Sequence, residues 1–247
     1  MDFNKATQQH IEMENFFSGG FVAKSGKSAQ RDAEFEKAAK KAQIEFEKAT
    51  QNAKIELDKI AVEVDACRKC ELGSQRMHSV PGQGNPKARI MFIGEGPGAD
   101  EDAQGLPFVG RAGQLLNKMI TAMGLKREDV YIANILKCRP PENRDPKPDE
   151  IINCLPYLQR QIEIIQPDII VALGAHAART LLENNKSIGD LRGHIHEYYP
   201  GLGKPMIKLL ATYHPAYLLR SYTHENRLRV WEDMKTVLAE LDLPVPE

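Results

Sequence analysis

Residues 90–113 read IMFIGEGPGADEDAQGLPFVGRAG, which joins an apolar run to a glycine-rich loop. The first four residues, Ile90-Met91-Phe92-Ile93, predict a buried strand, and the amphipathic pattern of residues 114–123 predicts a helix. Between them lie six glycines, two prolines, four acidic residues and one phenylalanine. Glycines let a ligand approach the backbone, so this mixture favours a small-molecule or base pocket over an ordinary turn.

Strand and helix patterns alternate through the rest of the chain from residue 66. Apolar strands are expected at 88–93, 130–136, 168–173 and 206–212, and helices at 114–123, 149–165, 175–183 and 226–241. This alternation predicts an α/β fold with a parallel sheet covered by helices on both faces. Right-handed crossovers then bring the C-terminal ends of the strands to one edge, where such sheets bind ligands.

Chemically distinctive residues follow each expected strand. Glu95 comes after the first strand, Asn134 ends the second, His176 follows the third and His214 follows the fourth. Because these segments lie far apart in the sequence, their convergence on one edge indicates a site more strongly than any single motif. His176 receives no specific role and is expected at a helix start.

The N-terminal part has a different composition, and we expect a boundary between residues 1–64 and 65–247. Residues 31–64 are rich in Ala, Glu and Lys, and a thin, mostly alanine stripe predicts one long helix. This helix lies on the domain or pairs weakly with another chain. Residues 10–17 resemble a sliding-clamp-binding peptide that lacks its leading glutamine, so a weak partner contact is expected there. The chain is expected to be a monomer.

Overall composition sets further limits. The formal net charge is −1, so no global basic field indicates nucleic acid, although a local groove can still be basic. No apolar run has the length of a membrane span, and the charged N-terminus lacks the core of a signal peptide. We therefore expect a cytoplasmic protein with no membrane partner.

Four cysteines form a candidate metal site. They are Cys67, Cys70, Cys138 and Cys154. The two-residue spacing of the first pair lets one turn of backbone present two thiolates to one metal. Four buried thiols, or a redox pair with two bystanders, are the alternatives. Sulfur ligands suit zinc or a [4Fe–4S] cluster, and the spacing does not decide between them.

Several motifs together resemble the iron–sulfur, family-four uracil-DNA glycosylases. The residues that carry the resemblance are Gly94-Glu95-Gly96-Pro97-Gly98, Gly105-Leu106-Pro107-Phe108-Val109-Gly110, Tyr131-Ile132-Ala133-Asn134, Lys137-Cys138-Arg139-Pro140-Pro141, Asn143-Arg144-Asp145-Pro146 and His214-Pro215-Ala216-Tyr217-Leu218-Leu219-Arg220. The resemblance implies a three-layer α/β/α sandwich with a four-stranded, mainly parallel sheet. It also implies a [4Fe–4S] cluster on the four cysteines, with zinc as the alternative, and uracil-containing DNA as the substrate.

The same resemblance implies roles for residues at the sheet edge. Glu95 positions a water and stabilises the cationic sugar, and His214 donates a hydrogen bond to the uracil O2 as negative charge develops. Phe108 stacks on the flipped base, and Asn134 pairs with its O4 and N3–H. Gly94 completes this uracil-binding pocket.

Further implied roles concern selectivity and DNA. Glu101 is expected to crowd the uracil C5 position and to exclude the methyl group of thymine. The segment after His214 is expected to enter the minor groove and fill the gap left by the base. Its candidate residues are Leu218, Leu219 and Arg220. Phosphate contacts are expected from Lys137, Arg139, Arg144 and Arg220.

The resulting hypothesis is a monofunctional DNA-repair glycosylase that leaves an abasic site and has no lyase step, since no lysine is an obvious Schiff-base nucleophile. One alternative is a non-enzymatic or covalent uracil-DNA binder, but residues 139–147 contain no histidine for such trapping. A glycosylase of broader specificity is a second alternative, which Glu95 disfavours. A nucleotide-binding module with a structural four-cysteine zinc site is the third, but the glycine spacing fits neither the dinucleotide fingerprint nor the P-loop.

Overall fold

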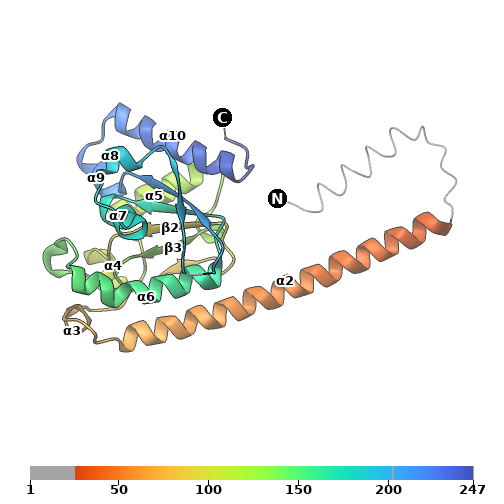
Figure 1. Ribbon diagram of the computed structural model, residues 1–247, viewed down its shortest axis with the longest axis horizontal. Helices are drawn as coiled ribbons and strands as arrows, with labels where there is room; N and C mark the ends of the chain where they lie inside the picture. The colour runs from red at the N-terminus through yellow and green to blue at the C-terminus, as the bar shows by residue number, and fades with distance from the viewer. Residues whose placement is uncertain (1–25, 202, 247) are drawn as a thin grey trace. The chain divides into compact units, whose positions relative to one another are not determined.

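The computed structural model describes residues 26–201 and 203–246 (Figure 1). The chain divides into two compact units, with the boundary between Ala49 and Thr50. The segment 10–17, where a partner contact is expected, lies outside the described residues. No helix in the described part of the chain combines the length and apolar character that crossing a bilayer requires.

Helix α2, Gly26–Ala66, confirms the predicted long helix and extends it at both ends. Residues 27–66 contain neither glycine nor proline, so nothing interrupts its hydrogen-bond ladder. Within the second unit the apolar stripe is buried at Leu57, Ile60 and Val64. Ile60 and Val64 pack with Tyr157 of helix α6. Thr50–Ala66 is therefore part of the same compact unit as the sheet.

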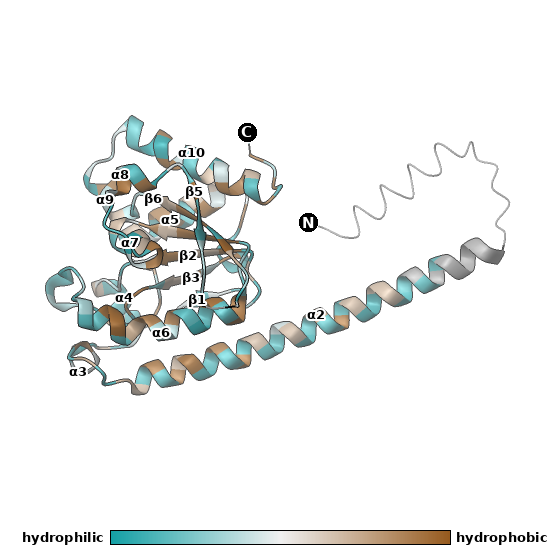
Figure 2. Ribbon diagram, viewed as in Figure 1, coloured by the Kyte–Doolittle hydropathy of each residue, from teal (hydrophilic) through white to brown (hydrophobic). Residues whose placement is uncertain are grey.

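Six strands form one sheet in the order β1-β3-β2-β4-β6-β5. Their bounds are β1 Gln83–Gly84, β2 Ile90–Gly94, β3 Tyr131–Asn134, β4 Ile169–Leu173, β5 Ile195–Tyr198 and β6 Ile207–Thr212. The four predicted strands are the central ones and run parallel, with Gly94 opposite Asn134 and Leu173 opposite Thr212. They are fully buried apart from Lys208 and are predominantly hydrophobic in Figure 2.

The expected count of four strands was wrong, because β1 and β5 add an antiparallel strand at each side of the sheet. Strand β1 has two residues, and β5 reads IHEY and is only partly buried. Neither has the continuous apolar run that identifies a central strand, so the sequence pattern misses both.

Helices cover both faces of the sheet, which confirms the three-layer arrangement (Figure 1). Their bounds are α3 Leu72–Gln75, α4 Ala99–Gln104, α5 Arg111–Ala122, α6 Pro148–Ile165, α7 Ala175–Leu182, α8 Ile188–Leu191, α9 Pro215–Arg220 and α10 His224–Glu240, with short 3₁₀ turns η1 Arg127–Asp129 and η2 Pro141–Asn143. Side chains of β2 alternate between two cores: Met91 packs on the α6 and α7 side, and Phe92 on the α5 and α10 side.

Candidate active site

The C-terminal ends of the four parallel strands meet at one edge of the sheet, as predicted. Glu95 directly follows β2, and Asn134 is the last residue of β3. His176 lies in the first turn of α7, just after β4, and His214 is the N-cap of α9, just after β6. Short connections after each strand hold these four side chains at that edge.

Gly94, Phe108 and Asn134 come together at the end of β2. A Cβ atom built on Gly94 would lie 2.4 Å from Asn134 Oδ1 and 2.6 Å from Phe108 Cζ. Phe108 is 5% exposed and Asn134 is 1% exposed. Asn134 Oδ1 is the only buried side-chain nitrogen or oxygen of the described residues that has no hydrogen-bond partner. An unpaired acceptor of this kind is costly, so a ligand that donates a hydrogen bond fits here.

Phe108 has a φ of 51°, which is the left-handed region that a bulky residue rarely adopts. Hydrogen bonds on both sides hold this conformation. Glu101 Oε1 accepts from the backbone N–H groups of Val109 (2.8 Å) and Gly110 (2.9 Å). Arg127 Nη1 donates to the Phe108 carbonyl (3.2 Å), and its Nη2 donates to the carbonyl of the preceding proline. We call residues 107–110 the Phe108 loop.

Glu101, which is expected to crowd the uracil C5 position, has a carboxylate that binds backbone N–H groups. Besides holding the Phe108 loop through Oε1, its Oε2 accepts from the backbone N–H of Gly98 (3.1 Å). Both carboxylate oxygens are therefore engaged by backbone groups. The Glu101 carboxylate therefore holds the Phe108 loop in place.

His214 has a defined tautomer in this structure. The backbone N–H of Ala216 donates to His214 Nδ1 over 3.1 Å, which leaves the ring proton on Nε2. Burial lowers the pKa of His214 to about 4, and the Arg220 cation contributes to the same shift. The ring is thus neutral above that pH and offers one N–H donor. Its centroid lies 5.7 Å from that of Phe108, which places His214 beside the Phe108 ring.

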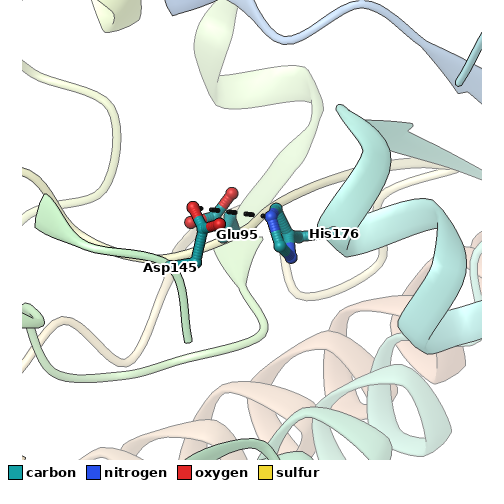
Figure 3. Close-up of side chains that lie close together, drawn as sticks. All are labelled: Glu95, Asp145 and His176. Atoms are coloured by element: carbon teal, nitrogen blue, oxygen red, sulfur yellow. Dashed lines mark ion pairs between the residues drawn. The ribbon is translucent and has the colours of Figure 1, made fainter. Parts of the chain in front are cut away.

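Glu95 is half-buried and has two titratable neighbours from other segments (Figure 3). One ligand atom each of Glu95, Asp145 and His176 lie within 4.8 Å of one another. Burial raises the pKa of Glu95, the His176 imidazolium opposes this, and the Asp145 carboxylate adds to it. Sequence reasoning assigned no role to Asp145 or His176, although both lie in segments that it had singled out.

The segment after His214 presents different residues from those expected. Leu218 is 2% exposed and packs in the α5 and α10 core, so its burial argues against a direct DNA contact. Tyr217 is 39% exposed, Leu219 is half-buried and Arg220 is exposed. On helix α9, Tyr217 and Arg220 are therefore the side chains most accessible to DNA.

The basic residues expected at phosphates also differ in accessibility. Lys137 is fully buried, and its Nζ donates to the Asn134 carbonyl (2.9 Å) and to Gln161 Oε1 (2.7 Å), so it cannot reach a phosphate. Arg144 donates to both carboxylate oxygens of Glu150, at 2.9 and 2.5 Å, and that pair neutralises its charge. Arg139 is half-buried and hydrogen-bonds an asparagine of its own loop.

The four cysteines come together from three segments. They are Cys67 after α2, Cys70 before α3, Cys138 after β3 and Cys154 in α6. Cys70, Cys138 and Cys154 pack in one small cluster, and Cys138 is close enough to Cys67 to interact electrostatically. Arg76 Nη1 donates to Cys138 Sγ over 2.8 Å, and the Tyr157 hydroxyl hydrogen-bonds Cys67. Thiolates surrounded by such donors suit a cationic metal centre.

Comparisons with known proteins agree with this arrangement. A family model described as the uracil DNA glycosylase superfamily matches residues 81–235, which include Glu95, Asn134 and His214. A type-4 uracil-DNA glycosylase of Sulfurisphaera tokodaii is 48% identical over 184 residues, which are 72% of this chain and 82% of that protein. One of Archaeoglobus fulgidus is 46% identical over 182 residues, which are 72% and 89% of the two chains. One of Thermotoga maritima is 46% identical over 177 residues, which are 71% and 90%.

Proposed function

Since this chain belongs to the uracil DNA glycosylase superfamily, we propose that its sheet-edge site excises uracil from DNA by hydrolysing the bond between base and deoxyribose. The chain is a DNA-repair enzyme, a hydrolase of N-glycosyl bonds. The observation that carries the proposal is the unpaired, buried Asn134 Oδ1, which lies with Gly94 and Phe108 where we place the uracil pocket.

Base recognition follows from the chemistry of that pocket. A base inside a duplex is out of reach, so the nucleotide must rotate out of the stack before it can bind. The Asn134 Oδ1 acceptor then receives the uracil N3–H, and the amide nitrogen donates to O4. Cytosine presents an acceptor at N3 and a donor at C4, which would leave this amide mispaired. The Phe108 ring supplies the stacking surface.

Bond cleavage requires groups at both ends of the breaking bond. Positive charge develops on the sugar, where the Glu95 carboxylate stabilises it and accepts a proton from the attacking water. Negative charge develops on uracil, where His214 Nε2–H donates to O2. A neutral imidazole suits this role because its protonation state does not change at physiological pH. A preorganised donor of this kind is worth about 3 kcal/mol in the transition state.

DNA is held by the segment after His214, with Tyr217 and Arg220 as its accessible residues. The Tyr217 ring fills the gap left by the flipped base, and Arg220 contacts phosphate. The product is an abasic site, without strand cleavage. Burial of Lys137 supports the absence of a lyase step, because its amine is enclosed and already donates two hydrogen bonds.

A [4Fe–4S] cluster is the cofactor that best fits the four cysteines. Among the residues that the structure describes, no three of their sulfurs lie within 4.8 Å of one another. Tetrahedral zinc with bonds of about 2.3 Å would bring its sulfurs to about 3.8 Å. A [4Fe–4S] cluster is larger, and the four cysteines would hold it between the end of α2, the end of β3 and helix α6. Hydrolysis requires no electron transfer, so its contribution is structural.

The test is incubation of the full chain with an oligonucleotide that contains one uracil. We expect an alkali-labile site at that position and an intact strand without alkali. Asn134→Ala should lower the excision rate by roughly 100-fold or more, because the pocket then loses its paired donor and acceptor. Absence of any alkali-labile product from the wild type would overturn the proposed function.

The cofactor has a separate test. We expect a brown protein with broad absorbance near about 400 nm, whereas zinc is colourless because its d-shell is full. Cys138→Ser should lose the absorbance and the bound iron. A colourless wild type, purified without oxygen and containing stoichiometric zinc, would overturn the cluster.

A further inference from the structure

Two residues that have no assigned role lie beside Glu95 at the sheet edge. Asp145 comes from the loop between η2 and α6, and His176 from the first turn of α7. His176 Nε2 lies 3.6 Å from Asp145 Oδ1, and both face Glu95 (Figure 3). Two carboxylates and one imidazole thus converge from three segments that are distant in the sequence.

The protein holds both partners in place. Arg144 anchors the loop that carries Asp145, since its guanidinium donates to the Asp145 carbonyl (2.9 Å) and to the buried Glu150. Gly174 has a φ of 91° and lies against His214, since a Cβ atom at Gly174 would be only 3.0 Å from the His214 Cβ atom. This left-handed turn lets the chain enter α7 directly after β4, which carries His176 to the edge.

We propose that Asp145 and His176 join Glu95 in holding the water that attacks the sugar. This inference rests on the proposed function and extends it to two further residues. The water donates one hydrogen bond to each carboxylate and accepts one from His176 Nε2–H. One lone pair then remains free, and it is directed at C1′.

The proposed reaction of this water with the sugar is a hydrolysis. The water oxygen forms a bond to C1′ while the C1′–N1 bond breaks, and the bonding electron pair leaves with uracil. Glu95 accepts the proton that the water loses and returns it to solvent. The uracil anion, held by His214, takes a proton from solvent on release. The Asp145 carboxylate places a second negative charge beside the cationic sugar, where it stabilises the transition state.

The two partners act on Glu95 in opposite directions, which provides a test. The charged groups that act on Glu95 are His176 of α7 and Asp145 of the loop before α6; His176 lowers the Glu95 pKa and Asp145 raises it. Glu95 works as a base only when ionised, so its pKa sets the acid limb of the pH–rate profile. Removing either charge should therefore shift that limb, with opposite signs.

The experiment uses the full chain with Asp145→Asn, His176→Gln and the double variant. Asp145 is 81% exposed and His176 is 35% exposed at the side chain, so neither change removes core packing. Asp168→Asn removes one carboxylate charge at the opposite end of the sheet, where Asp168 pairs with Arg89, and serves as the matched control. The rate of single-turnover excision is measured from acid to mildly alkaline pH. Binding affinity is measured with DNA that contains uncleavable 2′-fluoro-deoxyuridine.

We expect the single-turnover rate to fall by about 10- to 100-fold in each single variant, with little change in affinity. The acid limb should move to lower pH in Asp145→Asn and to higher pH in His176→Gln, and the shifts should offset in the double variant. Excision rates and acid limbs equal to those of Asp168→Asn would overturn the inference. Acid limbs that shift in the same direction in Asp145→Asn and His176→Gln would also overturn it. Neither result affects the proposed function, which fails only if the wild type excises no uracil.

Discussion

The site leaves no room for a side chain at Gly94. A Cβ there would lie within 2.6 Å of both Asn134 Oδ1 and Phe108 Cζ, in the space between the Asn134 amide and the Phe108 ring. Gly96 is two residues further along the same loop, and a Cβ built there would lie 3.5 Å from Leu136 Cβ, an ordinary contact. The two glycines therefore have different physical reasons to be present.

Alanine at these two positions should have different effects. Gly94→Ala must displace Asn134 or Phe108, and we expect uracil excision to fall roughly 100-fold, as for other misplacements of about 1 Å. Gly96→Ala should stay within about twofold of the wild type, because nothing has to move. Single-turnover rates on uracil-containing DNA measure both. Equal rates for Gly94→Ala and the wild type would contradict a pocket that closes around Gly94.

The Phe108 loop lies between helices α4 and α5, and charged side chains hold its backbone in place. Glu101, at the start of α4, accepts its N–H groups, and Arg127, in η1, donates to its carbonyls. Gly113 lets α5 begin close to this loop, since a Cβ there would lie 1.9 Å from the Phe108 carbonyl oxygen. The left-handed φ of Phe108 costs about 1–2 kcal/mol, and these contacts offset that cost.

Loss of the Arg127 guanidinium should therefore loosen the stacking surface without unfolding the protein. For Arg127→Met we expect about 10-fold weaker binding of free uracil, because charge-assisted hydrogen bonds to the loop are lost. Product inhibition of the excision assay measures this affinity. Arg89→Met is the matched control, since Arg89 makes a half-exposed ion pair with Asp168 at the other end of the sheet. An unchanged inhibition constant for Arg127→Met would rule out the positioning role.

The C-terminal part of helix α2 belongs to the same compact unit as the sheet. Residues 36–49 are exposed, whereas Leu57, Ile60 and Val64 are buried within the second unit. Glu63 also pairs with Arg160 of α6, with 2.8 Å between Oε1 and Nη2. The helix ends at Ala66, directly before Cys67, so the same segment positions the first of the four cysteines.

Two shortened chains should therefore behave differently. A chain that starts at Thr50 should unfold at the same temperature as the full chain and excise uracil at the same rate. A chain that starts at Asp65 also loses the buried residues Ala53, Leu57, Ile60 and Val64. The three larger side chains contribute about 1.5–3 kcal/mol each, about 5–9 kcal/mol together, which is comparable to the stability of a whole domain. Thermal and urea unfolding measure the difference. Equal midpoints for the two chains would show that residues 50–64 do not stabilise the domain.

Local patterns in the sequence predicted the four central strands, the helices that cover them and the edge where Glu95, Asn134 and His214 meet. These features depend on apolar periodicity and on the crossover rule, and both can be read from residues in order. Strands β1 and β5 lack an apolar run and were missed for that reason.

The contacts of individual side chains depend on how separate segments of the chain pack together. Leu218 is buried, but its helix has six residues and is too short for a periodic pattern to show which side faces the core. Lys137 is buried although its side chain is charged and it lies in a loop. Glu101 binds backbone N–H groups, and Asp145 and His176 meet beside Glu95, because the packing of separate loops brings them there. Such contacts join residues far apart in the chain, and no spacing within one segment encodes them.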